Sequence, residues 1–123
     1  MATLDNSVFD DGLNTLTNDA NRIDVTSQEA TTYAEATSTY TLGNSTSASA
    51  GSPADRTGGG REVEVGAISD GSISGTGTAT HYALVDTTNS VLLVTGSLTA
   101  SQSVTSGNTF SLAAFKIGIP DPS

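Results

Sequence analysis

His81 is the only histidine of the chain and the first residue to consider for chemistry, because imidazole can act as a general base or bind a metal. Its neighbours Thr80 and Tyr82 complete no nucleophile or ligand pattern. The G-x-S-x-G turn of many hydrolases and the zinc-binding H-E-x-x-H helix are both missing from the sequence. His81 is therefore predicted to be structural, and we do not expect an enzyme.

Two pairs of acidic residues could supply carboxylates for acid–base catalysis or for calcium: Asp10 with Asp11, and Glu62 with Glu64. The first pair lies near the start of a predicted helix, and the second alternates along a predicted strand face. The Asp-Gly-Ser sequence at 70–72 does not continue into an EF-hand or a calcium-binding nonapeptide repeat. These carboxylates are predicted to be solvated charges, with no metal ion or other cofactor.

Residues 51–61, GSPADRTGGGR, are rich in glycine, as phosphate-binding loops are. They lack the Lys-Ser/Thr end of such a loop and do not open a predicted helix. A tight or mobile turn is the prediction here.

Thirteen acidic residues against four basic ones give the chain a net charge of −9. Nucleic acids and anionic membranes both require cationic surface, so neither is an expected partner. The charge favours solubility, or alternatively complements a more basic partner. No apolar run approaches the ~20 residues of a membrane span, and the first residues lack the pattern of a secretory signal. We expect synthesis in a cytoplasm.

The 123 residues fit a single domain, 1–123. Only 35% of the residues are hydrophobic and 5% are aromatic, and there is no cysteine for a disulfide. The core of one subunit is therefore predicted to be thin, which favours a homo-oligomer as a source of further burial.

One helix is predicted, over residues 5–20. Phe9, Leu13 and Leu16 recur at helical spacing, and Asp5 or Asn6 can cap the first turn. Because the apolar stripe is narrow, it should dock against the sheet or a neighbouring subunit. Phe9 and Leu13 are therefore candidate partner contacts.

Residues 22–27 alternate like a half-buried strand, with Ile23 and Val25 on the apolar side. Residues 28–60 then show no periodicity, as is typical of disorder or of an arm ordered by another chain. Their sizeable apolar side chains are Tyr33, Tyr40 and Leu42, with a possible strand near the last two. We favour an arm on which these three side chains anchor a partner.

The remaining chain, residues 61–119, reads as antiparallel strands. Strands are predicted at 61–68 (with Val63, Val65 and Ala67 on one face), 78–86, 91–98 and about 109–119, with a short pairing segment at 72–74. A turn is expected at Asp70-Gly71, and burial on both sides at 91–94. Consecutive strands with short turns predict a meander. The fold class is mainly β: an antiparallel β-sandwich or jelly-roll-like domain with one short N-terminal helix and a long irregular arm.

A series of sequence phrases spans residues 5–122. After the predicted helix come R-I-D-V, T-x-Y-x-E-A, TYTLGN, P-x-D-R, GTATHYALVD, LLVTGSL and a closing FKIGIPDP. In this order they resemble the capsid decoration, or cement, proteins encoded among the head genes of tailed bacteriophages. The resemblance implies a β-rich subunit, expected to be a homotrimer. It would sit on the outside of an icosahedral capsid and clamp neighbouring major capsid proteins.

A different class stays open as an alternative: a receptor- or glycan-binding β-domain of a phage tail fibre or an adhesin. Such domains usually display aromatic platforms on which sugars stack. The chain has no Trp and three Tyr, so it is poorly equipped for that task.

Overall fold

The computed structural model describes residues 5–121 and confirms the predicted fold class: mainly β, with one short N-terminal α-helix. In chain order the elements are α1 (Asn6–Asp19), β1 (Arg22–Thr26), a short π-helix η1 (Glu35–Thr39), β2 (Thr41–Ser45), β3 (Ala54–Asp55), β4 (Arg61–Val65), β5 (Ile68–Ile73), β6 (Gly77–Asp86), β7 (Val91–Val104), β8 (Thr109–Leu112) and β9 (Phe115–Ile119).

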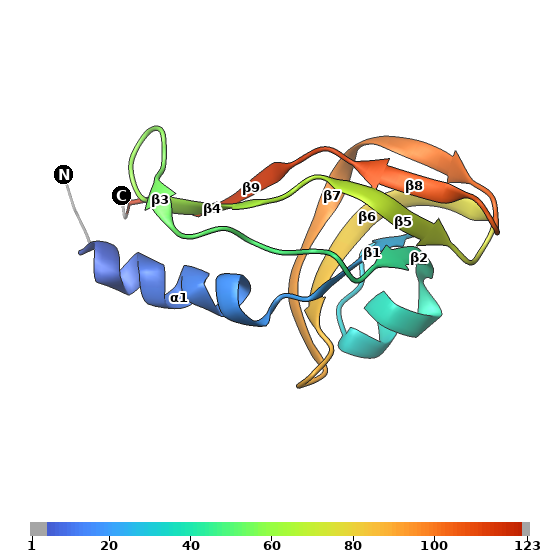
Figure 1. Cartoon of the computed structure of the whole chain (residues 1–123), viewed down its shortest axis with the longest axis horizontal. Helices are drawn as coiled ribbons and strands as arrows, with labels where there is room; N and C mark the ends of the chain where they lie inside the picture. Colours follow the sequence, from blue (N-terminus) through green and yellow to red (C-terminus); the bar gives the residue numbers. More distant parts are fainter. Residues whose placement is uncertain (1–4, 122–123) are drawn as a thin grey trace.

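The strands form two antiparallel sheets. Six strands in the order β7-β6-β1-β2-β5-β8 make a curled sheet, and β3, β4 and β9 make a smaller one. Figure 1 shows an elongated molecule, with the curled sheet at one end and α1 beside the three-stranded sheet at the other. The predicted meander is wrong, because β1 pairs with the distant β6, and β2 with β5.

Helix α1 forms as its sequence predicts. The Asp5 carboxylate accepts a hydrogen bond from the backbone N of Ser7 at 3.0 Å, which satisfies one of the free amides of the first turn. Phe9, Leu13 and Leu16 are buried, and the helix packs on β4.

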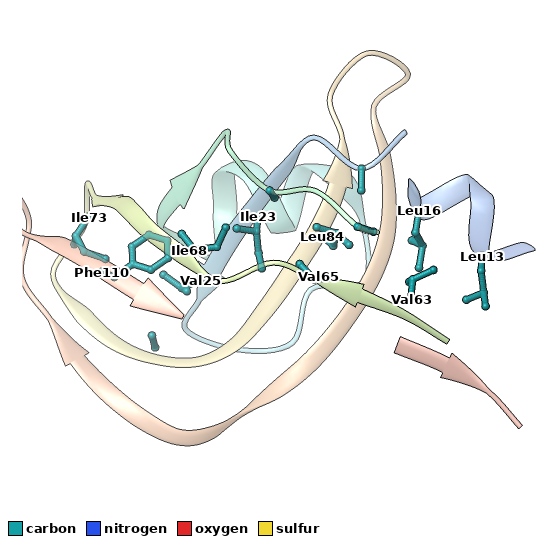
Figure 2. Close-up of a cluster of buried hydrophobic side chains, with 14 residues drawn as sticks. Leu13, Leu16, Ile23, Val25, Val63, Val65, Ile68, Ile73, Leu84 and Phe110 are labelled. Carbon is teal, nitrogen blue, oxygen red and sulfur yellow. The ribbon is translucent and has the colours of Figure 1, made fainter. Parts of the chain in front are cut away.

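The main core runs along the length of the molecule. Figure 2 shows it extending from Leu13 and Leu16 of α1, past Val63 of β4, to Phe110 and Ile73 at the far end of the curled sheet. Each element contributes only one or two large buried side chains to this core, and partly buried residues of β7 and β9 pack against it.

Strand β1 is buried on both faces, which corrects the prediction of a half-buried strand. Ile23 and Val25 belong to the main core, while Asp24 and Thr26 on the opposite face are 0% and 1% exposed. That face is covered because the chain around η1 closes over it. A second small cluster lies there: Ala30, Ala36, Ala83 and Val85, with Tyr33, Tyr40 and Leu92 against it.

Residues 28–60 are ordered in part by their own chain, which corrects the prediction of an arm ordered only by a partner. Strand β2 lies inside the curled sheet, where Gly43 pairs with Val25 on one side and Ile73 on the other. The possible strand near Tyr40 and Leu42 is thereby confirmed. Much of the rest of the segment is irregular, as predicted. Periodicity missed β2 because its sequence, TLGNS, is small and polar.

Strand β5 occupies the place of the predicted turn at Asp70-Gly71. The pairing of β5 with β8 is irregular between Ile68 and Gly71, and the ring of Phe110 lies where a side chain on Gly71 would be. The glycine therefore allows close packing rather than a reversal of the chain. The preceding strand β4 ends at Val65. Ala67 therefore does not share a strand face with Val63 and Val65, as predicted, but is exposed.

The single strand predicted at 109–119 is two strands in different sheets. β8 pairs with β5, whereas β9 pairs with β4. Phe110 is buried, but Phe115 and Ile117 are half-buried and Ile119 is 38% exposed. The chain thus crosses from one sheet to the other at its last apolar segment.

Strand β7 is an edge strand, although its apolar sequence predicted burial on both sides. It pairs with β6 alone within residues 5–121, and Val91 is 42% exposed. It is also longer than predicted, continuing to Val104.

Candidate functional site

His81 lies on β6 with its Nδ1 atom 2.8 Å from Oγ1 of the adjacent Thr80. Across the sheet it faces Thr26 on β1 and Ser97 on β7, none of which is acidic. Within residues 5–121 no group of three or more His, Asp or Glu side chains is placed to hold a metal ion.

The acidic pairs are split between different ion pairs. Asp10 accepts two hydrogen bonds from Arg61, at 2.9 and 3.2 Å, and Asp55 accepts a third at 2.7 Å. These bonds raise the pKa of Arg61. Lys116 lies 3.1 Å from Glu62, and that hydrogen bond raises the pKa of Lys116. The arrangement ties α1 and β9 to the β3–β4 hairpin.

The glycine-rich segment forms the tight turn of the β3–β4 hairpin, as predicted. Gly58, Gly59 and Gly60 all have positive φ angles, and the Arg56 side chain donates to the Gly59 carbonyl oxygen at 3.0 Å. A side chain on Gly60 would collide with the backbone of Ile119. The glycines therefore bring the hairpin up against β9.

A partly buried ion pair lies beneath η1, with the Arg22 side chain 22% exposed and that of Asp24 0% exposed. Arg22 donates from Nε and Nη2 to the two carboxylate oxygens of Asp24, at 2.7 and 2.9 Å. Thr41 of β2 donates to the same carboxylate at 2.5 Å. The hydrogen bonds to Asp24 raise the pKa of Arg22. This unit joins β1 to β2 and was not predicted, because an R-x-D pattern on a strand is also common on solvated faces.

A second polar link joins β5 to the end of β2. Ser45 donates to Asp70 at 2.8 Å, and Ser47 donates a short hydrogen bond to the other carboxylate oxygen. These hydroxyls lower the pKa of Asp70, with Ser47 the larger cause. Asp70 thus holds residues 45–47, the segment in which the chain leaves β2.

Acidification is expected to weaken the fold through Asp70. A carboxylate whose pKa is lower in the folded state contributes stability that is present above its unfolded pKa and lost as the pH falls through the folded one. For Asp70 that loss begins near the ordinary value of 3.8. Urea unfolding at about pH 6 and at pH values below 3.8 should show the fall, and Asp70→Asn should make it smaller. The exposed Asp11→Asn is the control, and an equal fall in wild type and Asp70→Asn would contradict the assignment.

One end of the molecule is formed by a unit that we call the helix–ribbon extension: α1 with β3, β4, β9 and their flanking residues (Figure 1). Its acidic residues outnumber its basic ones. The acidic set is Asp5, Asp10, Asp11, Asp19, Asp55, Glu62, Glu64 and Asp121, and the basic set is Arg56, Arg61 and Lys116.

Two exposed apolar side chains lie on this acidic extension. Val8 of α1 is 56% exposed and Ile119 of β9 is 38% exposed. The Cδ1 atom of Ile119 comes within 3.8 Å of the position that a Cβ on Gly12 would take, one helical turn after Val8. We call Val8 and Ile119 the α1–β9 patch. Within the described residues, they are the large hydrophobic side chains of the extension that are exposed.

The predicted contact residues lie elsewhere. Phe9 and Leu13 are each 2% exposed, so they are covered by their own chain and offer no surface to a partner. Tyr33 and Tyr40 are half-buried against the second cluster, and Leu42 is half-buried against the main core. Tyr33, Tyr40 and Leu42 keep part of their surface exposed, so their contact with a partner stays a prediction.

A cavity of about 320 Å³ opens between β7 and the β8–β9 connection. Its apolar lining includes Tyr82, Leu98, Leu112 and Phe115, and Gln102 is among its polar residues. The Tyr82 and Phe115 rings lie 4.6 Å apart, and burial raises the pKa of Tyr82. The two edges of the curled sheet therefore leave an open seam.

No family model, curated protein or solved structure matches this chain. Among residues 5–121, no helix has both the length and the apolar character needed to cross a membrane.

Proposed function

We propose that this chain is a capsid decoration protein of a tailed bacteriophage. After synthesis in the host cytoplasm it binds the outside of the icosahedral capsid as a homo-oligomer, a trimer. There it stabilises contacts between neighbouring major capsid proteins. The proposal rests on the order of sequence phrases from residue 5 to 122 and on the shape and surface of the helix–ribbon extension.

The α1–β9 patch is the observation that carries the proposal. Val8 and Ile119 are exposed on α1 and β9. These elements lie at the end of the molecule opposite the curled sheet (Figure 1), where they can reach a neighbouring shell subunit. The contacts of Arg61 with Asp10 and Asp55 hold helix and ribbon together, so the patch is presented on rigid elements. A preorganised apolar anchor loses little entropy on binding.

The charge of the extension favours a basic partner. Its excess of carboxylates around the α1–β9 patch would steer it toward positively charged sites on the shell and speed association. Because exposed charges are screened by salt, occupancy should fall as the ionic strength rises.

The test is co-sedimentation with expanded capsids. Replacing both Val8 and Ile119 by Asp should lower the affinity for capsids about tenfold or more, since each new carboxylate would lose its hydration in an apolar contact. Ser38→Asp with Thr105→Asp, which adds the same charge at exposed residues outside the extension, is the matched control and should bind like the wild type. Equal binding of the double variant and the wild type would contradict the proposed contact. Binding to a glycan array without affinity for capsids would instead favour a receptor-binding domain.

A further inference from the structure

The outer edge of β7 is open along a strand of 14 residues. Within the described chain its only pairing is with β6, so its other row of backbone N–H and C=O groups faces outward. Folded proteins usually protect such an edge with charged side chains or proline, because it can pair with a strand of another molecule.

Residues 87–115 contain no Asp, Glu, Lys, Arg, His or Pro. All of β7 and β8 lies in this segment. Irregularities in the pairing with β6 bend β7 but place no charge on it. In a chain of net charge −9, β7 therefore carries no charged side chain of its own, although Glu29 lies 3.4 Å from the Thr95 hydroxyl. Its second half faces β8 across the open seam.

The half-buried side chains near this edge are apolar. Leu98 of β7 faces the open seam together with Leu112 and Phe115, and Val91 is exposed at the other end of the strand. A strand added along β7 would cover these groups and satisfy the outward backbone groups at the same time.

We infer that the outer edge of β7 is where copies of this chain contact one another. Two copies that each carry a charge of −9 repel, and apposing their helix–ribbon extensions would bring carboxylates face to face. At the β7 edge a second copy can approach without this repulsion between carboxylates. A basic partner, in contrast, would find no electrostatic attraction at an uncharged surface, and we expect it to bind the acidic extension.

This contact does not require a capsid, so it can be tested on the purified chain. Sedimentation velocity over a range of concentrations should show an assembly with a mass above that of one 12.3 kDa chain. Replacing both Ser97 and Ser103, exposed residues of β7, by Glu should weaken self-association about a hundredfold, because like charges would then meet across the contact.

The matched control is Ser52→Glu with Thr57→Glu, which adds the same charge at exposed residues near the β3–β4 hairpin and should leave assembly unchanged. Hydrogen exchange is measured on the wild type, so its result does not depend on whether a variant folds. Protection of β7 amides should grow with protein concentration. A monomer at every concentration, or concentration-dependent protection confined to α1, would overturn the inference. Capsid binding by a monomeric chain would overturn the inference and the proposed trimer, while leaving the proposed decoration of the capsid intact.

Discussion

Replacing Arg22 by Met is expected to lower the free energy of unfolding by about 3 kcal/mol, because it leaves the carboxylate of a fully buried aspartate without its cation. Asp24 is 0% exposed and depends on two hydrogen bonds from Arg22 and one from Thr41. A loss of this size is a large fraction of the roughly 5–15 kcal/mol that stabilises most domains. Urea unfolding followed by far-UV circular dichroism measures it.

A double variant separates the pair from the simple loss of a side chain. With Asp24→Leu added to Arg22→Met, no charge stays buried, and most of the lost stability should return. Arg56→Met is the matched control, because Arg56 lies in the surface hairpin and bonds the Gly59 carbonyl. If the double variant were less stable than Arg22→Met alone, Asp24 would not be the source of the effect.

Replacing Gly43 by Val is expected to cost about 3 kcal/mol through overpacking in the middle of the curled sheet. A Cβ at this position would collide with the backbone carbonyl oxygen of Ser72 and lie 2.9 Å from Cδ1 of Ile73. Backbone atoms of a paired strand cannot rotate away, so β2 and β5 would have to separate.

The control for Gly43 is Gly66→Val, in the connection between β4 and β5. No atom lies within 4 Å of the position that a Cβ on Gly66 would occupy, so this variant should keep nearly full stability. Thermal unfolding of the two variants compares them directly. Equal stability of Gly43→Val and wild type would mean that residues 41–45 are not held inside the sheet.

The parts of the fold that the sequence predicts well are those with a clear apolar period. Phe9, Leu13 and Leu16 placed α1 correctly, and the alternation around Val63 and Val65 placed β4. Strand β2 was recognised only in part, because Gly43 and Ser45 fill a sheet interior where no large side chain fits.

Two further errors have local physical causes. Asp70-Gly71 has the composition of a turn, yet Ser45 and Ser47 satisfy the aspartate inside a paired strand. The apolar residues at 91–94 resemble a central strand. Whether a strand lies in the centre or at the edge of a sheet, however, is decided by its pairing with distant segments. Such pairing has no local signature in the sequence.

The candidate site was less predictable than the fold. Tyr33 and Tyr40 pack against a cluster in their own chain, a contact that no periodicity in residues 28–60 indicates. The α1–β9 patch joins residues from opposite ends of the sequence, and the Arg61 contacts that support it span 51 positions. Only a structure brings such residues together.

The most direct test of the proposed function is a cryo-EM reconstruction of the phage particle encoded alongside this chain, with the protein present at saturation. We expect additional β-rich subunits on the outer surface of the shell, with the helix–ribbon extension in contact with the major capsid protein. A shell whose outer surface carries no such density, or density for this chain only in the tail, would contradict the account.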